Sequence, residues 1–164
     1  MVFGLSLSAY TWVHIALSLA GLASGLVVLI GLFQSKRLDG WTALFLLTTV
    51  ATSVTGFGFP FDHFLPSHWV GVISLVFLAI AILARYAFRL AGAWRWIYVA
   101  TAVVALFFNT FVAVAQLFAK VPALKALAPT QSEPPFAITE FATLALFIVF
   151  AIVAAVKFHP KPAT

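Results

Sequence analysis

Five long apolar runs constrain the fold of this chain more than any other feature of its sequence. A helix that crosses about 30 Å of hydrocarbon needs roughly 20 mostly apolar residues. The runs cover residues 10–33, 41–58, 69–88, 96–118 and 137–156. They are continuous rather than alternating at every second residue, which favours helices over the strands of a membrane barrel. We therefore expect an all-α integral membrane protein, a single domain folded as a bundle of five transmembrane helices.

The composition argues against most other classes of protein. Apolar residues make up 64% of the 164 residues and charged residues only 8%, whereas soluble domains are about 45–50% apolar and about 25% charged. The nine Lys and Arg residues are too scattered to form a phosphate-binding stripe, so we expect the lipid bilayer as a partner and no nucleic acid. No cysteine is present, which excludes disulfides, thiolate nucleophiles and Cys-bound zinc or iron–sulfur clusters.

The basic residues predict the orientation of the bundle. With the N-terminus outside, seven Lys and Arg residues lie on the cytoplasmic side and two on the outer side. Such an excess on the cytoplasmic side is the usual arrangement in membrane proteins, so we expect the C-terminus in the cytoplasm. Arg85 and Arg89 lie four residues apart near the inner boundary. We expect both to extend toward anionic lipid head groups.

Small residues in the first run predict a close helix contact. Gly21 and Gly25 form a GxxxG pattern, which lets two helix backbones approach closely in lipid. One interpretation is a face for a homo-oligomer. The other, which we favour because five helices offer many internal partners, is packing within one bundle.

Polar side chains inside a membrane are costly, so each one is a candidate functional residue. Most of them fall on the predicted outer side, where they comprise His14, Asp62, His63, His68, Gln116 and Glu140. Asn109 lies near the middle of the fourth run. An unpaired amide would be expensive at that depth, so we expect Asn109 to bond another helix, with the threonines of the second run as candidates.

Several interpretations of the outer histidines are compatible with the sequence. His14 and His68 could bind the iron of haem b as axial ligands. Alternatively, His14, His63 and His68 could hold zinc or copper together with Asp62 or Glu140. A hydrogen bond between His14 and Glu140 would be a purely structural arrangement, and Asp62 and His63 could simply be solvated in an interfacial loop.

The segment 121–128 is apolar apart from one lysine and lies within a proline-containing linker. This pattern predicts a short interfacial or re-entrant helix. Such a helix could form a lid over His14, Gln116 and Glu140, or it could be a connector held at the head groups.

Two stretches carry a resemblance to known proteins. The residues GFGFPFDH at 56–63, and those at 121–135 that end in QSEPP, resemble small polytopic bacterial inner-membrane proteins of unassigned function. The resemblance extends along most of the chain. It implies a location in the bacterial inner membrane and brings no activity, cofactor or catalytic residue with it.

Three functional hypotheses follow. The first is a ligand-binding protein, in a redox accessory role, that holds haem, a metal ion or a quinone-like or other lipid-like molecule near the outer leaflet. Its candidate binding residues are His14, His68, Asn109, Gln116 and Glu140. The second is a metal-dependent membrane hydrolase. The third is a small transporter or a non-catalytic subunit of a larger membrane complex.

Overall fold

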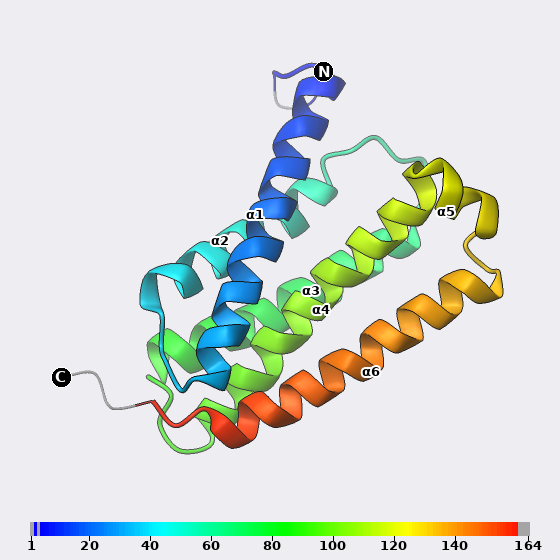
Figure 1. The fold of residues 1–164 in the computed structure, drawn as a ribbon. Helices are drawn as coiled ribbons and strands as arrows, with labels where there is room; N and C mark the ends of the chain where they lie inside the picture. Colours follow the sequence, from blue (N-terminus) through cyan, green and yellow to red (C-terminus); the bar gives the residue numbers. More distant parts are fainter. Residues whose placement is uncertain (1, 3, 161–164) are drawn as a thin grey trace.

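The computed structural model describes residue 2 and residues 4–160, and it is helical nearly throughout. In this part of the chain the only β contact is an isolated bridge between Val2 and Leu5. The helices, drawn in Figure 1, are α1 (Leu7–Phe33), α2 (Asp39–Gly56), α3 (Pro66–Ile82), the π-helical segment η1 (Leu83–Ala87), α4 (Trp94–Lys120), α5 (Pro122–Leu127) and α6 (Pro134–Lys157). The predicted all-α fold is confirmed.

The helices begin two or three residues before the predicted runs. Ser6 caps α1, because its Oγ accepts a hydrogen bond from the backbone N–H of Ala9 at 3.2 Å. Proline starts both α3 and α6, at Pro66 and Pro134. A proline costs little there, since the first turn of a helix has no partner for its N–H groups. A serine cap extends α1 beyond its apolar stretch, and prolines at the first turn extend α3 and α6.

Four segments are long and apolar enough to cross a membrane: α1, Pro66–Ala87, α4 and α6. They mark the chain as an integral membrane protein, as predicted. The segment α2 is a helix but is not among the four. It begins with Asp39 and Gly40 and is rich in threonine, which makes it the least apolar of the long helices. The predicted number of five crossings therefore depends on α2.

The helix α4 organises the bundle, because it packs against α1, α3, α5 and α6. The helix α2 packs on α1 and α3, while α6 runs along the edge (Figure 1). The helices α1 and α6 approach each other at their C-terminal ends, where the rings of Phe33 and Phe150 lie 5.7 Å apart, and diverge toward their N-terminal ends. Residues near the starts of α1 and α6 are consequently held on different parts of the fold.

The GxxxG face of α1 is used inside the bundle. A Cβ added to Gly25 would lie 2.5 Å from Leu106 Cδ1 and 2.9 Å from Phe45 Cε2, and one added to Gly21 would lie 2.8 Å from Asn109 Nδ2. Both glycines are buried against α2 and α4. The alternative of a homo-oligomer formed through Gly21 and Gly25 is therefore wrong in this arrangement, because the face is already occupied by the chain's own helices.

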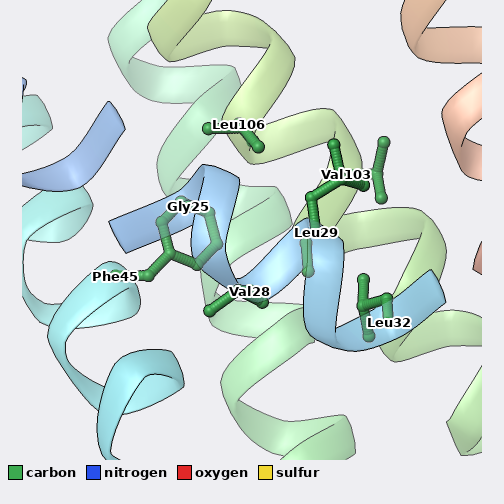
Figure 2. Close-up of a pocket in the computed structure, with 8 residues that line it drawn as sticks. Gly25, Val28, Leu29, Leu32, Phe45, Val103 and Leu106 are labelled. Atoms are coloured by element: carbon green, nitrogen blue, oxygen red, sulfur yellow. The ribbon is translucent and has the colours of Figure 1, made fainter. Parts of the chain in front are cut away.

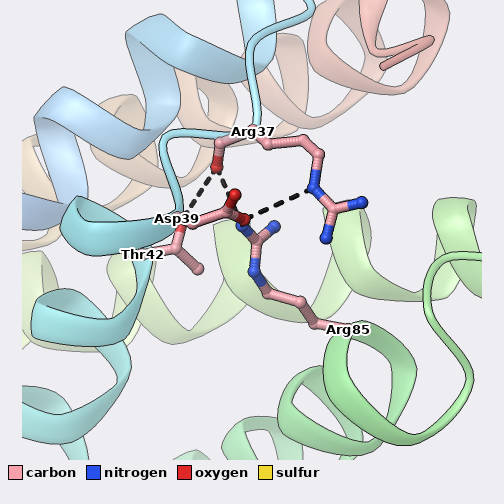
Figure 3. Close-up of polar contacts among 4 residues, drawn as sticks. All are labelled: Arg37, Asp39, Thr42 and Arg85. Atoms are coloured by element: carbon pink, nitrogen blue, oxygen red, sulfur yellow. Dashed lines mark hydrogen bonds and ion pairs between the residues drawn. The ribbon is translucent and has the colours of Figure 1, made fainter. Parts of the chain in front are cut away.

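The expectation that Arg85 reaches the lipid head groups is also wrong. Its side chain is only 1% exposed, and its Nη2 donates to Asp39 Oδ1 and, at 2.9 Å, to the carbonyl of Arg37 (Figure 3). The guanidinium also lies over the ring of Tyr98, with Cζ 5.1 Å from the ring centroid. The π-helical turn η1 contains Arg85, and α-helical periodicity cannot predict where such a turn aims its side chains. Arg89 is exposed, which suits its predicted position at the head groups.

Candidate functional site

Two of the candidate histidines lie at one end of the bundle, which we call the histidine end: the start of α1, the C-terminal end of α2, the α2–α3 loop and the start of α3. His68 is 5% exposed and is surrounded by phenylalanine rings. Its ring centroid lies 4.3 Å from that of Phe61, 4.9 Å from Phe64 and 5.4 Å from Phe57, the last pair being stacked. Phenylalanine cannot accept a conventional hydrogen bond, so these contacts leave the imidazole's polar edges to other partners.

One nitrogen of His68 caps its own helix. The backbone N–H of Leu65 donates to His68 Nδ1 at 2.9 Å. Because Nδ1 accepts, the neutral ring must carry its proton on Nε2. His68 is therefore a hydrogen-bond donor at Nε2. To bind a metal through Nε2 it would have to lose the cap, by moving its proton to Nδ1, or lose its only ring proton.

His14 has the opposite arrangement. Its Nδ1 lies 2.8 Å from Thr55 Oγ1, and that hydroxyl already donates to the carbonyl of Ala51 at 2.7 Å. A hydroxyl has a single proton, so His14 Nδ1 must be the donor to Thr55. The Nε2 atom of His14 is then left as an acceptor. The ring also meets Phe59 edge-on at 5.1 Å.

The α2–α3 loop connects the two histidines through its aromatic residues. Phe57 stacks on His68, and Phe59, two residues later, contacts both His14 and Tyr10. The hydroxyl of Tyr10 donates to the carbonyl of Thr55 at 2.7 Å, which ties α1 to the end of α2. One short loop thus places an acceptor imidazole and a donor imidazole on the same end of the bundle.

The remaining predicted ligands do not join them. Asp62 and His63 are exposed in the α2–α3 loop. Among the residues that the structure describes, no three His, Asp or Glu side chains lie close enough together to hold a metal ion. The set His14, His63, His68 and Asp62 is therefore not brought together as a zinc or copper centre in this structure.

Glu140 and Gln116 belong to the other side of the bundle. Glu140 is buried in α6, and neither of its carboxylate oxygens has a hydrogen-bond partner among the described residues. The expected hydrogen bond between His14 and Glu140 is therefore wrong, since His14 binds Thr55 instead. Gln116 is exposed near the end of α4.

Asn109 approaches the threonines of α2 as predicted but does not bond them. Asn109 Nδ2, Thr49 Oγ1 and Thr48 Oγ1 all lie within 3.4 Å of the point where a Cβ would stand on Gly21. Nevertheless, Asn109 Nδ2 and Thr49 Oγ1 have no hydrogen-bond partner in the described chain. Asn109 is therefore part of a mid-bundle polar contact and lies away from the histidine end.

A small cavity lies deeper in the bundle, between α1, α2 and α4 (Figure 2). Its volume is about 10 Å³, and it is lined by Gly25, Val28, Leu29, Leu32, Phe45, Ala102, Val103 and Leu106. A space of that size holds about one water molecule at most. Neither haem nor a quinone ring fits in this cavity.

The predicted helix at 121–128 is present as α5, which packs on α4. The linker that follows is held by Gln131, whose Nε2 donates to the carbonyl of Ala115 at 2.6 Å. The segment is thus attached to the end of α4. No hydrogen bond or ring contact in the described chain joins α5 to His14, which lies across the bundle between α1 and α2.

Glu133, the last residue before α6, gives a pH-dependent prediction. Desolvation acts to raise the pKa of Glu133, but hydrogen bonds from Thr130 and Ser132 outweigh it and hold the pKa below its usual value. Its contribution to loop order is therefore present above the unfolded-state pKa of 4.5 and is lost as the pH falls through the lower folded-state pKa. Hydrogen exchange should show the Thr130 amide losing protection in that range. Glu133→Ala should lack protection at every pH; equal protection in both proteins would contradict the assignment.

Sequence reasoning identified His14 and His68 but missed the aromatic surroundings of His68. The signal was the row of phenylalanines at 57, 59, 61 and 64. The tautomers could not be predicted, because each depends on a contact that forms only in the folded chain.

Comparison with known protein families, with curated proteins and with solved structures gave no match.

Proposed function

We propose that the chain crosses the membrane five times, with its N-terminus outside, and binds a quinone-like or related ring-bearing lipid at the histidine end. The helix α2 supports five crossings because its 18 residues span about 27 Å, close to the thickness of the hydrocarbon core. The excess of basic residues on the opposite side supports the orientation. A bacterial inner membrane, suggested by the sequence resemblance, is part of this proposal.

The observation that carries the proposal is the environment of His68. Its Nε2–H is a donor suited to a carbonyl oxygen, and its ring belongs to a group of aromatic side chains. Phe61, Phe64 and Trp69 in this group are 44%, 47% and 61% exposed, so a flat ring could pack on them from the lipid. A quinone head group combines a flat ring with carbonyl acceptors, and its isoprenoid tail would remain in the bilayer.

His14 complements this arrangement. Its Nε2 is an acceptor, so it suits the hydroxyl of the reduced, quinol form of such a ligand. Haem ligation by both histidines fits less well, because two axial ligands require two unprotonated Nε2 atoms and the hydrogen bonds leave only one. A quinone-binding role is compatible with a redox accessory or with a subunit of a larger membrane complex.

The proposal predicts quenching of tryptophan fluorescence by a quinone analogue with a short tail. Trp69 lies next to His68 in sequence, and its ring is 5.1 Å from Phe64. His68→Leu should weaken binding roughly tenfold or more, because both a hydrogen bond and aromatic packing are lost. His63→Leu is the matched control, since His63 is exposed in the same loop, and it should bind as the wild type does.

Two results would overturn this proposal. One is equal quinone affinity in His68→Leu and His63→Leu. The other is a purified protein that carries haem, recognised by a Soret band, or stoichiometric zinc, with the signal abolished in His14→Ala. That second result would replace the quinone with a haem or metal ligand at the same end of the bundle.

A further inference from the structure

Glu140 stands where a helix-packing residue is expected. The buried residues of α6 are Glu140, Phe147 and Ala154, which are spaced seven apart and so share one face. That face is directed toward α4, because the rings of Phe147 and Phe107 are 5.7 Å apart. The rest of α6 is largely exposed, and its face opposite α4 is available to lipid. A carboxyl therefore occupies a position that an apolar side chain would normally fill.

The carboxyl of Glu140 has no hydrogen-bond partner among residue 2 and residues 4–160. It is 8% exposed, and both of its oxygens are enclosed without a hydrogen bond in the described chain. The basic groups on the helices around it are engaged or distant: Arg95 binds the carbonyl of Phe158, His14 binds Thr55, and Lys120 and Lys125 are exposed. The two ion pairs found in the described chain both involve Asp39.

An ionised carboxylate in such a place would be very costly. Transfer of an isolated charge into a medium of low polarity costs far more than transfer of the neutral acid, and a buried group without a partner takes up a proton instead. The packed arrangement of α4 and α6 is therefore compatible with a neutral Glu140. Even the neutral acid finds no hydrogen-bond partner in the part of the chain that the structure describes, so the residue lowers stability relative to an apolar one.

We propose that Glu140 is a proton-binding site that controls the packing of the first turns of α6 against α4. The site lies six residues after Pro134, which is about 9 Å along the helix from its start. A proton can therefore be exchanged with the aqueous phase at that end of the bundle. Loss of the proton leaves a carboxylate that is more stable in water or beside Lys120 than against α4. This inference is independent of the proposed quinone site.

An apolar carbodiimide tests the proposal in proteoliposomes. The reagent requires a protonated carboxyl: the acid proton moves to a carbodiimide nitrogen, the carboxylate oxygen adds to the central carbon, and an oxygen-to-nitrogen acyl shift gives a stable N-acylurea that retains the whole reagent. We expect mass spectrometry to find the adduct on Glu140 in preference to the exposed Asp62. Its rate of formation should fall as the pH rises, because the reactive neutral form is lost.

Hydrogen exchange provides a second measurement. In the wild type, the first turns of α6 should lose protection as the pH rises, because ionisation of Glu140 separates them from α4. Glu140→Gln, which stays neutral, should show constant protection over the same range, and Glu140→Leu should resist unfolding better than the wild type. The proposal fails if Asp62 is labelled in preference to Glu140. It also fails if the wild type and Glu140→Gln share one pH profile, because packing then does not depend on this proton.

Discussion

Replacing Gly25 with leucine is expected to destabilise the bundle by more than about 3 kcal/mol. Gly25 lies where α1 meets α2 and α4, and even a Cβ would come within 2.5 Å of Leu106 and 2.9 Å of Phe45. Both of those side chains are 1% exposed, so neither can move out to the surface. The cavity beside them, at about 10 Å³, is much smaller than a leucine side chain.

The matched control is Gly40→Leu. A Cβ on Gly40 meets nothing within 4 Å, and this residue is exposed in the first turn of α2. The same substitution should therefore leave stability nearly unchanged. Unfolding in mixed detergent micelles, followed by circular dichroism, measures both. If Gly25→Leu unfolds at the wild-type midpoint, α1 does not pack on α2 and α4 through this face.

Gly25→Ala should give an intermediate result. Overpacking of a core costs about 1–3 kcal/mol, while alanine in a helix interior recovers about 1 kcal/mol relative to glycine. A net loss of up to about 2 kcal/mol is expected. The graded series from glycine to alanine to leucine would attribute the effect to volume and not to backbone propensity.

These glycines also illustrate how far the sequence predicts the fold. Apolar length alone located α1, α3, α4 and α6, because a membrane requires long continuous stretches of this kind. The GxxxG pattern indicated a close contact but did not specify its partner. The partner depends on the shapes of residues such as Phe45 and Leu106, which are distant in sequence and meet only in the folded bundle.

The candidate site, like the fold, could be predicted from the sequence only in part. The cost of polar groups in a membrane was enough to select His14, His68 and Glu140 from the sequence. The structure then placed Glu140 apart from His14, because α1 and α6 diverge toward their N-terminal ends (Figure 1). Whether a histidine donates or accepts depends on one contact to its other nitrogen. Thr55 and the N–H of Leu65 provide those contacts, and neither could be inferred from composition or spacing.

The buried arginine at the opposite end of the bundle carries the second large prediction. Asp39→Ala should destabilise the protein by about 2–3 kcal/mol, whereas Arg85→Met should change stability by less than about 1 kcal/mol. Arg85 is 1% exposed at its side chain and Asp39 is 71% exposed. Removal of the aspartate leaves a buried cation with a single hydrogen-bond acceptor, the carbonyl of Arg37.

Removal of the arginine has a different consequence. The Nε and Nη1 atoms of Arg85 are buried and have no hydrogen-bond partner among the described residues, so Arg85→Met eliminates two unsatisfied groups. Asp39 retains its contact with Arg37 Nε at 3.3 Å and its access to water. The carbonyl of Arg37 still accepts a hydrogen bond from Thr42 Oγ1 at 3.1 Å (Figure 3). The stability lost with the ion pair and the stability gained by removing a buried charge therefore nearly cancel.

The double variant decides whether this explanation holds. With Met at position 85, Asp39→Ala should cost only the favourable effect of an acidic residue at the start of α2, about 0.3–1 kcal/mol. The effects of the two substitutions should then differ from additivity by about 1–3 kcal/mol. If the losses of stability caused by the two substitutions are additive, Asp39 acts on α2 alone. A loss of more than about 3 kcal/mol in Arg85→Met would mean that the guanidinium stabilises η1 through its packing on Tyr98 and not through the ion pair.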